Sequence, residues 1–214
     1  MDYFGRRVCV LEEIEKAIKD LKVNGKRGFT QTVDLMVSLK GIDLKKPENK
    51  FSDDVSLPYG RGKDANIVVF SDNLKDLDCD ILTSQDIQRF TTDKREARKL
   101  AVQTDFFFSE APLMPSIGKS LGQILAPRGK MPKVLTGDVK KLIETYKKNV
   151  RIVVKNAPVI QCLVGKEDME DRKLAENVEA VLKFLEMKLS RGRQNIGKVM
   201  VKLTMGKPVK IEVK

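Results

Sequence analysis

Apolar residues recur with a helical period near the start of the chain. Between residues 10 and 23 they are spaced three and four residues apart, which predicts an amphipathic helix that ends at Asn24-Gly25. The apolar positions are Leu11, Ile14, Ile18 and Leu21.

The next segment, residues 30–39, alternates strictly between apolar and polar side chains. A period of two predicts a strand with one buried face. Its inward positions are Val33, Leu35, Val37 and Leu39, and its outward positions are Thr30, Thr32, Asp34, Met36 and Ser38. The outward face is therefore left for something other than the core.

The last part of the chain shows the same two patterns, a helical period followed by alternation. A second amphipathic helix is predicted over residues 174–189, and two alternating strands follow it at 198–204 and 209–214. The turn between the two strands is Met205-Gly206-Lys207-Pro208.

The middle of the chain has a different pattern. Residues 41–66 are rich in proline, glycine and charge, which favours an exposed connection. Continuous apolar runs without alternation then follow, as expected for strands covered on both faces of a parallel sheet. These runs are Ile67–Phe70, Phe106–Phe108 and Ile152–Val154, with helices predicted at 93–101 and 138–148.

The two ends are thus alike and differ from the middle. We interpret the chain as α/β, with an outer α+β domain formed by residues 1–66 and 157–214 and an inserted α/β domain at residues 67–156. Two separate domains joined by one linker are the alternative.

Charge and composition narrow the function. The 214 residues contain 41 Lys and Arg against 30 Asp and Glu, a net charge of +11, which favours a polyanionic partner such as nucleic acid or an acidic membrane surface. The chain has no histidine, which excludes Ser-His-Asp triads, Cys-His pairs and histidine metal sites. No apolar run approaches the ~20 residues of a membrane span, and three scattered cysteines fit a reduced cytoplasmic protein.

The basic residues gather near the C-terminus. From Lys188 onward there are eight of them against Glu212 alone, and several fall on the outward face of the predicted hairpin. Such a face can set charge against phosphates while small polar groups reach sugar hydroxyls, so we expect RNA or DNA contact here. A solvated charged face is the alternative.

Other motifs give little support for catalysis. Gly118-Lys119-Ser120 lacks the earlier glycine of a phosphate-binding loop, and Gly60-Arg61-Gly62 precedes a strand where a dinucleotide motif would follow one. Carboxylates cluster at Asp53-Asp54, Asp76-Asp78-Asp80 and Asp168-Glu170-Asp171. They could hold Mg²⁺, but helix capping explains them as well, and we expect no cofactor and no metal.

The stretch Pro127-Arg128-Gly129-Lys130-Met131-Pro132 is unusual because two prolines flank a basic turn. Physically it predicts either a rigid, positively charged turn or a plain loop.

Three motifs carry a resemblance to a known family. Pro127–Pro132, Thr204-Met205-Gly206 and Phe29-Thr30-Gln31-Thr32-Val33 resemble those of the L-one stalk proteins of the large ribosomal subunit, in their archaeal form. The motifs occur in the family's order, and the resemblance covers essentially the whole chain.

The resemblance implies an inserted three-layer α/β/α domain with a Rossmann-like sheet that binds no dinucleotide. It implies that the outer domain binds the ribosomal RNA of the mobile stalk, that the stalk assists release of exit-site transfer RNA, and that the protein represses its own messenger RNA. We therefore expect a cytoplasmic, ribosome-associated protein that is not an enzyme and is a monomer off the ribosome.

The predicted RNA-binding site combines the family motifs with the hairpin. Its residues are Phe29, Thr30, Gln31, Thr32, Lys198, Met200, Lys202, Thr204, Met205, Gly206, Lys207 and Pro208. A secondary basic motif comprises Pro127, Arg128, Gly129 and Lys130. The alternative function is a Mg²⁺-dependent RNA-processing enzyme. A third possibility is a basic protein held on acidic membranes, but the sequence has no strongly basic amphipathic helix that would support it.

Overall fold

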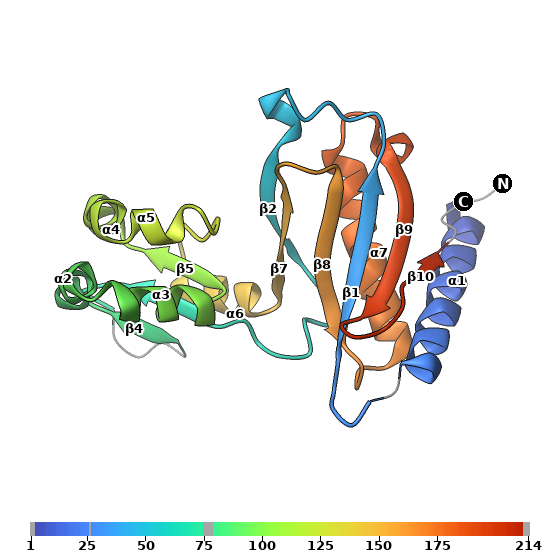
Figure 1. The fold of residues 1–214 in the computed structure, drawn as a ribbon, viewed down its shortest axis with the longest axis horizontal. Coiled ribbons are helices and arrows are strands. Elements are labelled where there is room, and N and C mark those ends of the chain that lie inside the picture. Colours follow the sequence, from blue (N-terminus) through green and yellow to red (C-terminus); the bar gives the residue numbers. More distant parts are fainter. Residues whose placement is uncertain (1–2, 26, 75–78, 212–214) are drawn as a thin grey trace. The chain divides into compact units, whose positions relative to one another are not determined.

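The structure is a computed structural model that describes residues 3–25, 27–74 and 79–211. The chain divides into two compact units (Figure 1). Unit 1 comprises Met1–Lys63 and Lys148–Lys214, and unit 2 comprises Asp64–Lys147. Mixed parallel and antiparallel pairing makes the chain α/β, as predicted.

Unit 1 is built around a four-stranded antiparallel sheet. In spatial order the strands are β10 (Val209–Ile211), β9 (Ile196–Leu203), β1 (Thr32–Leu39) and β8 (Val159–Lys166). Strand β1 pairs on both sides with strands from the far end of the sequence. The predicted alternation of β1 is confirmed, because every second residue from Val33 to Leu39 is buried. Strand β8 is an element that the sequence analysis did not predict.

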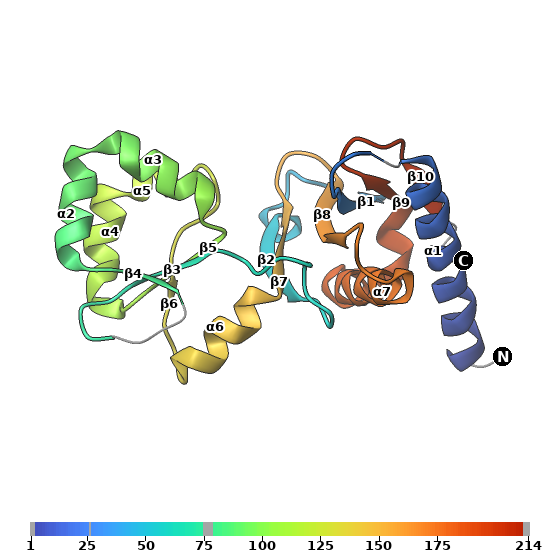
Figure 2. The same ribbon diagram turned by 90° about the horizontal axis from the view of Figure 1, so that it is seen from below.

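Two helices cover one face of this sheet. Helix α7 (Asp171–Lys188) lies behind the strands in Figure 1, and Figure 2 shows it on one side of them. Helix α1 (Tyr3–Asn24) packs against α7 and β10, so the predicted helix at 10–23 is present and begins earlier. Apolar side chains of both helices share one core with the inward residues of β1. In the part of the chain that the structure describes, no helix covers the opposite face.

A two-stranded antiparallel ribbon in unit 1 corrects the sequence analysis. Strand β2 (Phe51–Ser56) lies where an exposed connection was expected, and it pairs with β7 (Asn149–Val154). The run Ile152–Val154 is therefore no strand of the inserted domain, and unit 2 ends at residue 147 instead of 156. The reason is that β7 alternates between buried and outward side chains, as a strand with one buried face does. Ile152 and Val154 are fully buried, while Arg151 faces the other way and pairs with Asp54 at 3.1 Å.

Two connections of unit 1 contain 3₁₀ turns. The link between β1 and β2 contains the 3₁₀ turn η1 (Pro47–Asn49), and η3 (Gly192–Asn195) joins α7 to β9. The last predicted strand covers residues 209–214, and residues 212–214 of it lie outside the described residues.

Unit 2 has three layers. Its parallel sheet has the order β4 (Asp80–Leu82), β3 (Ile67–Phe70), β5 (Phe106–Ser109) and β6 (Lys133–Val134). The sheet is flanked by α2 (Ser84–Thr92), α3 (Lys94–Gln103), η2 (Ala111–Leu113), α4 (Met114–Ser120), α5 (Gly122–Leu125) and α6 (Val139–Lys147). Helices α2 to α5 pack on one face and α6 on the other. The apolar runs at 67–70 and 106–108 are buried parallel strands, as predicted.

A buried amide fixes the segment that follows β2. Asn177 of α7 is completely buried, and its Nδ2 donates to the carbonyls of Gly60 at 2.9 Å and Val164 at 2.8 Å. Its Oδ1 accepts from the backbone N–H of Tyr59 at 3.1 Å. All three partners are main-chain groups, so the amide side chain ties helix α7 to the Tyr59–Gly60 turn and to β8.

We expect Asn177→Ala to lower the free energy of unfolding by about 2 kcal/mol, because it leaves main-chain groups without partners in the interior. Urea denaturation measures the change. The control is Glu176→Ala, which removes an exposed hydrogen bond from Tyr59 Oη and should change stability by only about 0.5 kcal/mol. Equal losses in the two variants would contradict this structural role.

Candidate RNA-binding surface

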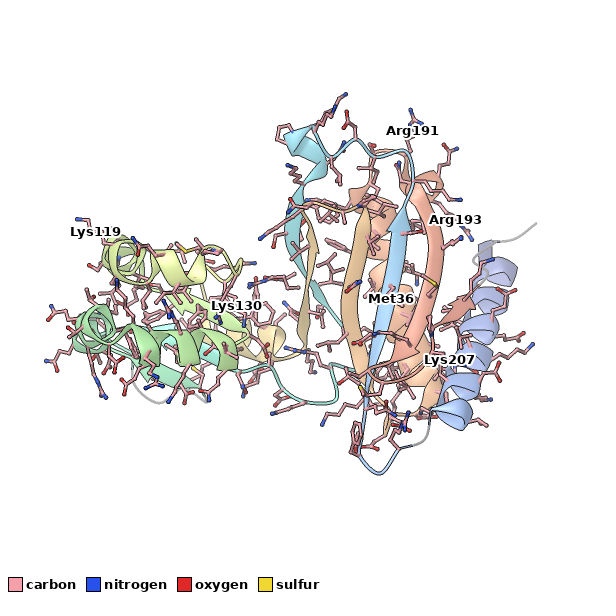
Figure 3. All side chains as sticks on the ribbon, viewed as in Figure 1. Met36, Lys119, Lys130, Arg191, Arg193 and Lys207 are labelled. Carbon is pink, nitrogen blue, oxygen red and sulfur yellow. The ribbon has the colours of Figure 1, made fainter. Side chains whose placement is uncertain are left out.

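The uncovered face of the unit 1 sheet carries polar, basic and methionine side chains. Across its centre, Met36 of β1 lies opposite Met200 of β9 and Gln161 of β8, and Lys210 of β10 lies beyond Met200. Met36 is labelled at the middle of this face in Figure 3. Lys198 and Lys202 occupy the positions on either side of Met200 along β9. This face therefore combines positive charge with a flexible apolar centre.

The turn after β9 is held against the start of β1. Thr204 donates to the carbonyl of Thr32 twice, from its backbone N–H at 3.1 Å and from its hydroxyl at 3.2 Å. Gly206 closes the turn by donating to the carbonyl of Leu203 at 2.9 Å, and a Cβ added to it would lie 3.1 Å from the Cβ of Leu203. Met205 is 66% exposed at the tip. The turn thus presents Met205 on a fixed backbone.

Gln31 is buried, whereas the sequence analysis placed it on the RNA-binding surface. Its side chain is only 2% exposed, so it does not form part of the outer surface. Its Nε2 donates to the carbonyl of Gly25 at 2.7 Å, and its Oε1 accepts from the backbone N–H of Met205 at 3.2 Å. The expectation that Gln31 faces RNA is corrected: burial with both ends of the amide paired makes it a positioning residue for the turn.

The other predicted residues lie on the surface around this turn. Phe29 is 58% exposed and Thr30 is also exposed, and they directly precede Gln31. Lys207 and Pro208 are exposed just after Gly206. The Gln31–Met205 and Thr32–Thr204 hydrogen bonds bring the first and last predicted motifs together, although about 170 residues of sequence separate them.

Asp34 is a feature of this face that the sequence analysis left out of the site. It points outward from β1, opposite Lys202 on one side and Leu163 on the other. Partial burial raises the pKa of its carboxyl above the ordinary value, and the nearby Lys202 ammonium offsets part of that rise. Its alternation with Val33 and Leu35 was the available signal, but alternation gives a direction and no function.

The secondary basic motif lies in unit 2, in the turn after α5. Gly129 has φ +67°, and Lys130 donates from its backbone to the carbonyl of Leu125 at 3.0 Å, which closes the end of that helix. The ammonium of Lys130 donates to the carbonyls of Ala101 at 3.0 Å and Thr104 at 2.6 Å. The expectation of an exposed basic turn is therefore wrong for Lys130, whose ammonium caps the end of α3. Pro127 and Arg128 are exposed.

The carboxylate clusters considered for Mg²⁺ do not converge in the described residues, where no three His, Cys, Asp or Glu side chains form a group fit for a metal. Asp53 pairs with Lys188 at 2.8 Å, and Asp171 pairs with Lys22 at 2.7 Å. Asp76 and Asp78 lie outside the described residues. Among the described helices, none has the length and apolar character of a membrane span.

Comparison with known proteins supplies the family. Residues 17–207 match the model of the ribosomal protein L1p/L10e family. The chain belongs to this family. Similar proteins, each named large ribosomal subunit protein uL1, come from three archaea. The one from Thermococcus kodakarensis is 45% identical and that from Pyrococcus horikoshii 46%, with 94% of this chain and 97% and 96% of theirs covered. The one from Methanothermobacter thermautotrophicus is 39% identical, with 94% and 99% covered.

Family membership confirms the resemblance stated from the three sequence motifs. The L1p/L10e match begins inside α1 and ends at Lys207, so it includes β1, the whole of unit 2 and the Thr204–Gly206 turn. The family consists of ribosomal proteins, so the chain is no enzyme, as predicted.

We expect Asp34→Asn to stabilise the protein at neutral pH. A raised pKa means that the folded state binds the proton more tightly, so the contribution of Asp34 to stability falls as the pH rises above 3.8, the ordinary aspartate value. Thermal unfolding from pH 3 to pH 7 should show the advantage of the variant growing with pH. The control is Asp168→Asn at an exposed position. An equal gain in both variants, or a gain largest at pH 3, would contradict the assignment.

Proposed function

We propose that this protein is a structural component of the large ribosomal subunit and that unit 1 binds the ribosomal RNA of the mobile stalk. The observation that carries the proposal is the Thr204–Gly206 turn, hydrogen-bonded to Gln31 and Thr32 at the end of an uncovered basic sheet face. The similar archaeal proteins bear the name of a large-subunit protein, which supports the ribosomal part.

The chemistry of the face suits folded RNA. An A-form helix presents a wide, shallow minor groove with 2′-hydroxyls, which hydroxyl and main-chain groups of a rigid turn can pair with. Lys198, Lys202 and Lys207 supply positive charge for the phosphates nearby. Exposed Phe29 and Met205 give an apolar cover over those hydrogen bonds. Charge then supplies affinity, and the covered polar contacts supply selectivity.

Three further roles belong to the proposal and rest on the resemblance. The stalk assists the exit-site transfer RNA to leave, the protein represses translation of its own messenger RNA, and it acts in the cytoplasm on the ribosome. The same turn would serve both RNAs if the messenger site imitates the stalk, because one rigid surface then meets one RNA shape. Away from RNA we expect a monomer.

The deciding experiment compares variants on a transcript of the large-subunit stalk by filter binding at physiological salt. Met205→Asp puts a carboxylate at the tip of the turn, and Thr204→Ala removes the hydroxyl that braces the turn on Thr32. We expect each to weaken binding by about 10- to 100-fold, as for one to two lost buried hydrogen-bond partners.

The control for that experiment is Lys141→Ala, an exposed lysine on α6 of unit 2 that pairs with Asp138. It should change affinity by less than about threefold, since a single exposed charge away from the proposed site contributes little. Equal losses for all three variants would place the binding surface elsewhere. Intact transcript after incubation with Mg²⁺ is the result expected of a binding protein, and cleavage would favour the RNA-processing alternative.

A further inference from the structure

A second basic region lies at the other end of strand β1, where three connections meet. Lys40 donates from its backbone to the carbonyl of Asn195 at 2.7 Å, and Asn195 Nδ2 returns a bond to the carbonyl of Lys40 at 2.8 Å. Asn195, which is buried, also accepts from the backbone N–H of Arg191 at 2.8 Å. Leu39 donates to the carbonyl of Pro158 at 2.8 Å. These bonds fix the β1–β2, β7–β8 and α7–β9 connections together.

An open groove of about 470 Å³ lies within this region. It is lined by Ile42, Asp43, Leu44, Lys45, Lys50, Lys155 and Asn156. Ile42 and Leu44 pack against the core of unit 1, so they give the groove a fixed apolar floor. The three lysines are exposed around it.

Within the part of the chain that the structure describes, the three lysines of the groove form no ion pair. Among the side chains that the structure describes, no carboxylate lies within 4.0 Å of the ammonium groups of Lys45, Lys50 or Lys155. Asp43, the acidic residue in the lining, is used by its own loop, because its carboxylate accepts from the backbone N–H of Lys45 at 2.9 Å. Its carbonyl accepts from Asn49 Nδ2 at 2.7 Å. Three like charges held close together favour an anionic ligand.

The neighbouring surface extends this charge. Lys40, Lys46 and Arg191 are exposed on the same connections, and Lys198 begins the basic row of β9 at this end of the sheet. Figure 3 shows Arg191 and Lys207 at opposite ends of the strands, with Met36 between them. These basic residues lie at the end of β1 that is opposite to the Thr204–Gly206 turn, and a strand of eight residues is about 25 Å long.

We infer that this groove binds the phosphate backbone of a second segment of the RNA whose first segment lies on the Thr204–Gly206 turn. The inference rests on the proposed function of that turn. Phosphates of one folded RNA meet lysines at both ends of the same rigid sheet, and the apolar floor accommodates a sugar or base. An acidic protein would satisfy the charge, but the proposed RNA contact at the other end of the same strand favours RNA. The groove sets the orientation of the RNA along β1.

The test is the double variant Lys50→Ala/Lys155→Ala on the stalk transcript, with binding measured between 50 and 200 mM salt. We expect about a tenfold loss of affinity at physiological salt, and the slope of log affinity against log salt should become shallower by about two, for two lost phosphate contacts. The matched control is Lys119→Ala/Lys141→Ala, which removes the same charge from exposed positions of unit 2. It should leave the slope close to that of the wild type.

A shortened transcript separates a local contact from general attraction. If the RNA is trimmed until only the segment bound by the turn remains, the double variant and the wild type should bind equally. An equal loss on the trimmed and full transcripts, or a control variant with the same change of slope, would overturn the inference.

The outcomes also distinguish this inference from the proposed function. Selective binding by the wild type with no effect of the double variant would overturn the groove alone, and no preference of the wild type for the stalk transcript would overturn both. Normal RNA binding by the double variant combined with poorer retention on large subunits would assign the groove to a protein partner and overturn the RNA assignment.

Discussion

The candidate surface depends on one buried side chain, the amide of Gln31. It joins the end of α1, through the carbonyl of Gly25, to the turn that carries Met205. The backbone of Gln31 is held as well, because its carbonyl accepts from the N–H of Glu167 at 2.9 Å. A buried amide is costly unless its polar atoms are paired, so this arrangement has little freedom to shift. The rigid turn at the surface is therefore a consequence of a satisfied polar contact below it.

The sheet of unit 1 adds a second constraint, because among the described elements helices cover only one of its faces. Helices α1 and α7 take up the apolar side of β1, and the alternation of the strand then forces Met36, Asp34 and their neighbours to the other side. Among the described residues of this face, Met36 and Met200 lie at the centre, and Asp34, Lys202 and Lys210 lie around them, so the charged groups surround an apolar middle. Such a surface is suited to a broad, shaped polyanion more than to a small ligand.

Local patterns in the sequence were sufficient to predict burial where the spacing of apolar residues along one element determines which side chains face the core. The inward residues Val33, Leu35 and Val37 and the buried runs of β3 and β5 are cases of this kind. The same approach misassigned β7, because Ile152-Val153-Val154 reads as a continuous run unless Arg151 is counted as the outward residue paired with Asp54. Gln31 and Lys130 were misread because their partners, Met205 and Ala101, are distant in sequence, and no local pattern reports such contacts.

The pairing of β1 also determines when this surface can first exist. Both neighbours of β1, β8 and β9, are made only after all of unit 2 has been synthesised. A growing polypeptide therefore carries β1 without sheet partners while the compact segment of residues 64–147 can already fold. Thr204, Met205 and Gly206 follow later still. A nascent chain consequently has no assembled turn with which to hold RNA, and that capacity arises only in the last stage of translation.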